Sequence, residues 1–136
     1  MVDPESIEAR LSRLGELLAE LERIRAEGRP AYDAGLRAHL ACQHALQLAI
    51  QTCIDIGTHL ISEHELEMPS DYRGVFRALE PLGLSAELAE RLGSAAGLRN
   101  VLVHDYLKVD DDLVWGALEN LDDLRDFAGF AATLLD

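Results

Sequence analysis

Residues 38–54 read AHLACQHALQLAIQTCI and contain no Asp, Glu, Lys or Arg. The stretch lies inside a longer helical pattern that runs from about Tyr32 to about Glu65. A helix with so few charged side chains has no wide polar face to present to water, so other helices must surround it. We therefore expect residues 32–65 to form the central helix of a bundle.

The chain before this stretch predicts an amphipathic helix from about Asp3 to Ala26. Apolar side chains recur there at spacings of three and four residues, at Ile7, Leu11, Leu14, Leu18 and Leu21. Such spacing places them on one face of a helix. Gly28, Arg29 and Pro30 follow and are expected to end the helix.

The chain after the central stretch predicts three more helices and no strand. Pro69 and Ser70 interrupt the pattern, and a short helix is expected from Asp71 to Leu79. Ser85 is a candidate N-cap for a fourth helix, which should end near His104. The acidic run 110–112 should cap a last helix that continues through Ala131. The sequence thus predicts an all-α, up-and-down bundle of four long helices and one short helix, in a single domain spanning residues 1–136.

Composition narrows the class of protein. The chain has 136 residues and a formal net charge of −13, and it contains no apolar run of 18 residues, so we expect a cytoplasmic protein with no membrane partner. Cys42 and Cys53 lie eleven positions apart, which separates them by about 16 Å along one helix and excludes a disulfide between them. The acidic charge disfavours a free-standing nucleic-acid binder, because basic patches supply most affinity for phosphate.

The segment Arg99-Asn100-Val101-Leu102-Val103-His104-Asp105-Tyr106 carries the strongest candidate chemistry. Arginine can hold two phosphate oxygens at once, and histidine can exchange a proton near neutral pH. Together they could cleave a phosphodiester without a metal or other cofactor. On an ideal helix Arg99 and His104 diverge by about 140°, so we expect the helix to fray at His104, with Tyr106 turning back along an extended segment. Asn100 and His104 share a face.

This segment resembles the RX4HXY signature of HEPN-domain ribonucleases, specifically the HepT-like toxins of bacterial type VII toxin–antitoxin pairs. The resemblance extends over residues 7–135, and includes the long uncharged helix, the stretch Met68-Pro69-Ser70-Asp71-Tyr72-Arg73 and the acidic last helix. It implies an endoribonuclease toxin in which Arg99 binds the scissile phosphate, His104 is the general base or acid, and Asn100 orients its neighbours. It also implies an MntA-like nucleotidyltransferase antitoxin that silences the toxin by AMPylating Tyr106.

The net charge leaves other functions open. A homodimer could place two copies of Arg99 together, with Arg91 or Lys108, and so form a local positive cleft for RNA in an acidic body. The alternatives are a non-catalytic helical adaptor that binds the nucleotidyltransferase, and a purely structural dimer.

Two further patterns allow more than one interpretation. His39, Gln43, Gln47, Gln51, Asp55 and His59 recur every four residues along the central helix. They form either a partly solvated face or a set in which Gln47, Gln51 and Asp55 line the cleft that faces Arg99 and His104. The small residues 93–97 mark a close helix approach, made either by the central helix or by a second subunit.

Overall fold

A computed structural model describes residues 4–135, which form helices, turns and loops with no strand among them. The chain enters its first helix at Pro4, and Asp3, where we expected it to begin, lies outside the described residues. The elements are α1 (Pro4–Glu27), α2 (Arg29–Asp33), α3 (Leu36–Glu63), α4 (Tyr72–Arg77), η1 (Glu80–Leu82), α5 (Ala86–His104), η2 (Tyr106–Lys108), α6 (Asp111–Leu118) and α7 (Asp122–Thr133).

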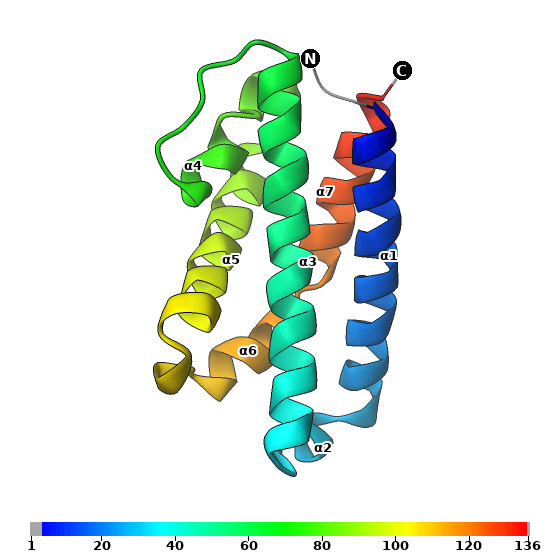
Figure 1. The fold of residues 1–136 in the computed structure, drawn as a ribbon, viewed down its shortest axis with the longest axis vertical. Coiled ribbons are helices and arrows are strands. Elements are labelled where there is room, and N and C mark those ends of the chain that lie inside the picture. Colours follow the sequence, from blue (N-terminus) through cyan, green and yellow to red (C-terminus); the bar gives the residue numbers. More distant parts are fainter. Residues whose placement is uncertain (1–3, 136) are drawn as a thin grey trace.

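The helix α3 lies at the centre of the bundle, as its uncharged sequence predicts. It runs between α1 and α5, with α7 behind it (Figure 1), and it contacts α1, α4, α5 and α7. Its core-facing side chains, among them Leu46, Ile50 and Ile54, are almost completely buried. The described helices share one hydrophobic core around this helix.

The predicted count of four long helices and one short helix is wrong at two places. The expected start at Tyr32 fails because residues 29–33 form the separate helix α2, between Gly28 with a φ of 91° and the extended Gly35. The expected last helix is divided into α6 and α7. Asn120 lies at this break: its side chain donates to the carbonyl of Gly116 at 2.8 Å, while its backbone N–H donates to the carbonyl of Ala117 at 3.1 Å. The tighter bond turns the chain into a new helix.

The two cysteines are not joined to each other, as their spacing predicts. Cys42 and Cys53 are free thiols in the core, and burial raises the pKa of Cys42 to about 11. Within residues 4–135, no helix is long and apolar enough to cross a membrane.

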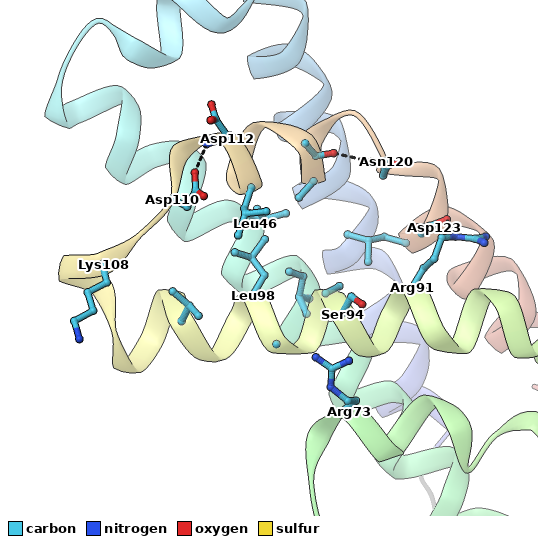
Figure 2. A pocket seen from close by; sticks show the side chains of 18 residues that line it. Leu46, Arg73, Arg91, Ser94, Leu98, Lys108, Asp110, Asp112, Asn120 and Asp123 are labelled. Atoms are coloured by element: carbon cyan, nitrogen blue, oxygen red, sulfur yellow. Dashed lines mark hydrogen bonds and ion pairs between the residues drawn. The ribbon is translucent and has the colours of Figure 1, made fainter.

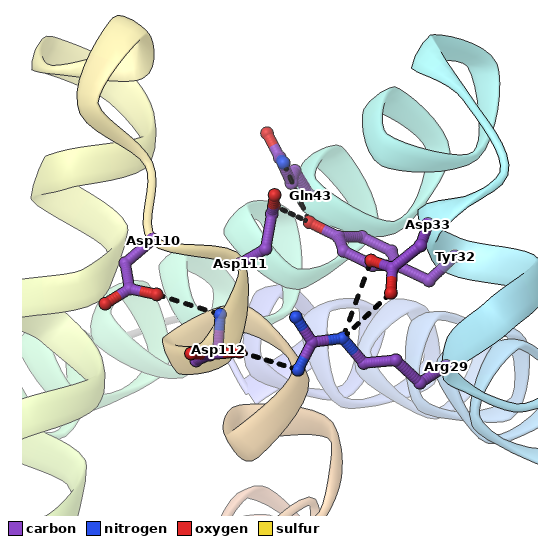
Figure 3. Close-up of polar contacts among 7 residues, drawn as sticks. All are labelled: Arg29, Tyr32, Asp33, Gln43, Asp110, Asp111 and Asp112. Atoms are coloured by element: carbon purple, nitrogen blue, oxygen red, sulfur yellow. Dashed lines mark hydrogen bonds and ion pairs between the residues drawn. The ribbon is translucent and has the colours of Figure 1, made fainter.

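A polar cluster fastens α6 to the start of the bundle (Figure 3). The buried Tyr32 hydroxyl donates to Asp111 at 2.5 Å and accepts from Gln43 at 2.9 Å, which joins α2, α3 and α6. Arg29 adds an ion pair with Asp112 at 2.8 Å. Burial, and then the bond to Asp111, raise the pKa of Tyr32 well above its ordinary value. The cluster therefore fixes where the chain resumes after η2.

The short helix α4 docks on α3 at Gly57, where there is no room for a side chain. A Cβ atom at this position would lie 2.6 Å from Cγ1 of Val75 in α4 and 3.4 Å from Cδ1 of Leu79. Next to this contact, Phe76 of α4 meets Phe127 of α7 edge to face at 5.3 Å. The missing side chain thus lets α4 sit directly on α3.

We expect Gly57→Ala to lower the free energy of unfolding by about 1–3 kcal/mol, because the added methyl group would overpack the α3–α4 contact. Gly15→Ala is the matched control, since Gly15 lies in α1 with no atom within 4 Å of the new methyl group. There the higher helix propensity of alanine should add up to about 1 kcal/mol. Urea unfolding followed by circular dichroism measures both, and equal stabilisation by the two substitutions would contradict the close approach.

Candidate active site at the end of α5

The helix α5 carries the RX4HXY residues and ends where the sequence predicts. Its N-cap Ser85 accepts a hydrogen bond from the N–H of Leu88 at 3.2 Å, and its last residue is His104. The helix is continuous from Ala86 to His104. Arg99 and His104 therefore remain about 7.5 Å apart along the axis and about 140° apart around it. Within one chain, the two side chains leave the helix in different directions.

The segment after α5 differs from the expected extended strand. Residues 106–108 form one turn of 3-10 helix, η2, closed by a bond from the Lys108 N–H to the Asp105 carbonyl at 2.8 Å. Tyr106 is 68% exposed and Leu107 is 88% exposed. The Tyr106 hydroxyl has no hydrogen-bond partner within residues 4–135. The phenol is therefore free to meet another molecule.

Two neighbours hold the guanidinium of Arg99. Its Cζ atom lies 5.0 Å from the centroid of the Tyr72 ring, in a cation–π contact. Its Nη1 atom donates to Oδ1 of Asn100 at 2.9 Å. Asn100 lies one turn before His104 on the same face of α5, so the residue that accepts this bond lies between the guanidinium and the imidazole around the helix.

The Nε atom of Arg99 is buried and has no hydrogen-bond partner in the described part of the chain. An unsatisfied buried donor costs about 1–3 kcal/mol, so this arrangement does not serve stability.

Tyr72 is the site residue that sequence reasoning missed. It is the first residue of α4, and its N-cap Asp71 accepts from the Gly74 N–H at 2.8 Å. The segment 68–73 supports the family resemblance, but no spacing rule links Tyr72 to Arg99 across 27 positions. Only the docking of α4 beside α5 brings the ring to the guanidinium.

Two of the small residues 93–97, Gly93 and Gly97, contact α4, a neighbour that we did not expect; α5 also packs on the central helix α3, as one alternative predicted, and a contact with a second subunit stays a prediction. The side chain of Arg73 lies across them: its Cγ would be 3.0 Å from a Cβ atom at Gly93, and its Nη2 would be 2.9 Å from one at Gly97. The two glycines therefore make room for an arginine of α4.

Two of the polar residues that recur every four positions along α3 bond to each other. Gln51 donates to Asp55 at 2.8 Å, while the Oε1 atom of Gln51 is buried without a partner among the described residues. No hydrogen bond joins Gln47, Gln51 or Asp55 to Arg99 or His104 within residues 4–135. Their place in the cleft stays a prediction.

Positive charge is distributed unevenly over this acidic protein. Residues 71–108 contain five acidic and five basic side chains, so the net charge of −13 comes from the rest of the chain. Arg91, which we expected to enrich the cleft, forms an ion pair with Asp123 at 3.0 Å. In contrast, no ion pair within residues 4–135 engages the cations of α4, the end of α5 and η2, which are Arg73, Arg77, Arg99 and Lys108.

An apolar groove of about 820 Å³ lies between α5 and α6, next to these cations. Lys108 lies at one end and the Arg91–Asp123 ion pair at the other, with Leu98 and Leu46 between them (Figure 2). Arg99, Asn100, His104 and Tyr106 do not line the groove. The RX4HXY residues therefore lie outside it.

Solved structures share the whole fold. A chain from the complex of tri-AMPylated Shewanella oneidensis HEPN toxin with MNT antitoxin is 23% identical, with a TM-score of 0.86 over 98% of this chain and 99% of that chain. The Bacillus subtilis cytosolic protein of unknown function YutE is 21% identical, with a TM-score of 0.86 over 98% and 91% of the two chains. These likenesses confirm the helical HEPN architecture.

Two relatives identified by sequence are nucleases. The tRNA nuclease HepT of Aphanizomenon flos-aquae is 33% identical over 121 residues, which cover 86% of this chain and 80% of the relative. The mRNA nuclease HepT of Shewanella oneidensis is 34% identical over 86 residues, which cover 62% and 63% of the two chains. The family model described as ribonuclease HepT-like matches residues 14–131, and the chain therefore belongs to the HepT-like ribonuclease family.

Proposed function

We propose that this protein is the endoribonuclease toxin of a toxin–antitoxin pair. The single observation that carries the proposal is the end of α5, where a guanidinium is held by Tyr72 and Asn100 but by no carboxylate of residues 4–135. An imidazole and a phenol lie exposed beyond it. The names of the relatives, tRNA nuclease and mRNA nuclease, agree with this chemistry.

The proposed reaction uses side chains alone. Arg99 binds the scissile phosphate and stabilises the additional negative charge of the transition state. His104 removes the proton of the ribose 2′-hydroxyl as that oxygen attacks the phosphorus. The bond to the 5′-oxygen then breaks, and this oxygen leaves with the electron pair and takes up a proton from an acid. The products are a 2′,3′-cyclic phosphate and a 5′-hydroxyl.

A homodimer would complete this site. The reaction needs a base and an acid, yet each α5 supplies one histidine, and Arg99 and His104 leave that helix about 140° apart. A two-fold axis beside α5 would bring a second guanidinium and a second imidazole to the same phosphate. The divergence within one chain supports this assembly.

Tyr106 is the proposed point of control. The MNT antitoxin of Shewanella oneidensis forms a complex with a tri-AMPylated HEPN toxin. We infer that a nucleotidyltransferase antitoxin adds AMP to the Tyr106 phenol, which is 68% exposed. The added phosphate would repel RNA from the adjacent cations and block the end of α5 sterically. Both steps take place in the cytoplasm in this proposal, where the RNA and the nucleotide donor are found.

The second candidate function is a non-catalytic adaptor that binds the nucleotidyltransferase. The net charge of −13 favours it, because most of the protein surface would repel nucleic acid. The balanced charge of residues 71–108 favours the nuclease instead. An adaptor would leave RNA intact under all conditions.

We expect His104→Ala and Arg99→Ala each to lower the rate of RNA cleavage by at least about 100-fold, because they remove the proton-transfer group and the phosphate-binding group. Cleavage of tRNA and of mRNA by the purified protein in EDTA is the measurement. His64→Ala is the matched control. His64 is an exposed histidine that follows the last residue of α3, at the other end of the bundle from His104, and its ring contacts the Leu60 carbonyl. Equal cleavage by wild type and His104→Ala would refute the assignment.

We expect Tyr72→Ala to lower kcat about tenfold, because the Arg99 guanidinium would lose the ring that holds it. Tyr72→Phe keeps the ring face and should retain most of the activity. The ratio of the two kcat values tests the contact, with circular dichroism to establish that both variants fold. If phenylalanine fails as badly as alanine, the hydroxyl rather than the ring is important.

Co-expression with the cognate nucleotidyltransferase should add one or more AMP units to the wild-type chain and none to Tyr106→Phe. Intact-protein mass spectrometry measures the additions. Tyr72→Phe is the control for a second exposed tyrosine near the site. If Tyr106→Phe carried as many AMP units as the wild-type chain, the acceptor would lie at another residue.

A further inference from the structure

The side chain of Arg73 has a defined path along the surface of α5. Its Cγ atom lies beside Gly93 and its Nη2 atom beside Gly97, so the side chain extends toward the C-terminal end of the helix. A Cβ atom at these positions would lie 3.0 Å and 2.9 Å from those two atoms, so a larger residue at either one would shift the Arg73 side chain from this path. The guanidinium is thus directed toward the RX4HXY residues.

This path places a second guanidinium on the same face of α5 as the imidazole. Gly93, Gly97, Asn100 and His104 are spaced by four, three and four residues, which aligns them in one stripe along the helix. Gly97 precedes His104 by two turns, or about 10 Å along the axis. The preceding residue of α4, Tyr72, holds Arg99. Adjacent residues of α4 therefore position two guanidinium groups around the end of α5.

Arg73 has no carboxylate partner within residues 4–135 and is exposed to solvent, although Arg91 on the same helix α5 is neutralised by Asp123. A planar, permanently charged guanidinium that has no carboxylate partner among the described residues is suited to bind a phosphate. Arg73 also lines the edge of the groove between α5 and α6.

We propose that Arg73 is an RNA-positioning residue that binds a backbone phosphate next to the scissile one. This inference rests on the proposed nuclease function. Arg73 would hold the strand in register along the stripe from Gly97 to His104, while Arg99 binds the phosphate that reacts. Because backbone phosphate contacts are independent of base identity, this contact fixes the position of the strand and the length of RNA required, without reading its sequence.

The first test measures binding of a fluorescent single-stranded oligoribonucleotide to the His104→Ala protein, which binds without cutting. Adding Arg73→Ala should weaken binding about tenfold, and the slope of log affinity against log salt should become shallower by about 0.7, the value for one lost phosphate contact on a single strand. Arg77→Ala is the matched control, because Arg77 lies one turn along α4 and also has no ion pair among the described residues. Equal losses from Arg73→Ala and Arg77→Ala would reduce the effect to general charge and overturn the proposal.

The second test moves the guanidinium without removing it. In Gly97→Ala the new methyl group displaces Nη2 of Arg73, while alanine favours the helix, so the melting temperature should not fall. RNA binding should weaken in the same direction as in Arg73→Ala, and the double variant should bind no more weakly than Arg73→Ala alone. Unchanged binding by Gly97→Ala, or additive losses in the double variant, would overturn the proposal.

RNA cleavage by the wild-type protein distinguishes a failure of the role proposed for Arg73 from a failure of the proposed nuclease function. If wild type cuts RNA and Arg73→Ala in an active background cuts it with an unchanged KM, Arg73 has no positioning role although the protein is a nuclease. If wild type neither cuts nor binds RNA, the proposed function itself fails. A raised KM with a kcat close to that of wild type is the result we expect.

Discussion

The docking of α4 between α3 and α5 is the contact on which the site depends. A helix of six residues is not stable alone, so its position comes from packing. Gly57 of α3 receives it on one side, and Gly93 and Gly97 of α5 make room for its arginine on the other. Tyr72 reaches Arg99 only because both contacts are made. One glycine of α3 and two of α5 thus lie at the contacts through which this six-residue helix places its functional side chains.

Charge is divided between the body and the site. The acidic side chains lie mainly in the segments before residue 71 and after residue 108, where ion pairs such as Arg29–Asp112 and Arg125–Glu22 use up much of the positive charge. The cations of α4, the end of α5 and η2 are left unpaired within the described chain. A negative body with a locally balanced segment disfavours long-range attraction of RNA while still allowing contact at the site.

Local signals in the sequence were sufficient for part of this structure. The uncharged residues 38–54 predict the central helix, Ser85 predicts the start of α5, and the end of α5 at His104 follows from the motif. Asn120 was not recognised as a break, because its effect depends on a bond to the Gly116 carbonyl that apolar periodicity does not reveal. The pairing of Tyr72 with Arg99, and of Arg73 with two glycines, requires the tertiary position of α4. The contact of Gly93 and Gly97 with α4 was not expected for the same reason, whereas the helix count was wrong because of the separate helix α2 and the break between α6 and α7.

The turn η2 is anchored on both sides. It follows α5 directly, and two residues after it the chain reaches the cluster in which Arg29, Tyr32 and Gln43 secure α6. A group added to the Tyr106 phenol would therefore extend into solvent without disturbing the core. The modified protein would stay folded. An enzyme that removed the added group would therefore restore the toxin's activity without new protein synthesis or refolding.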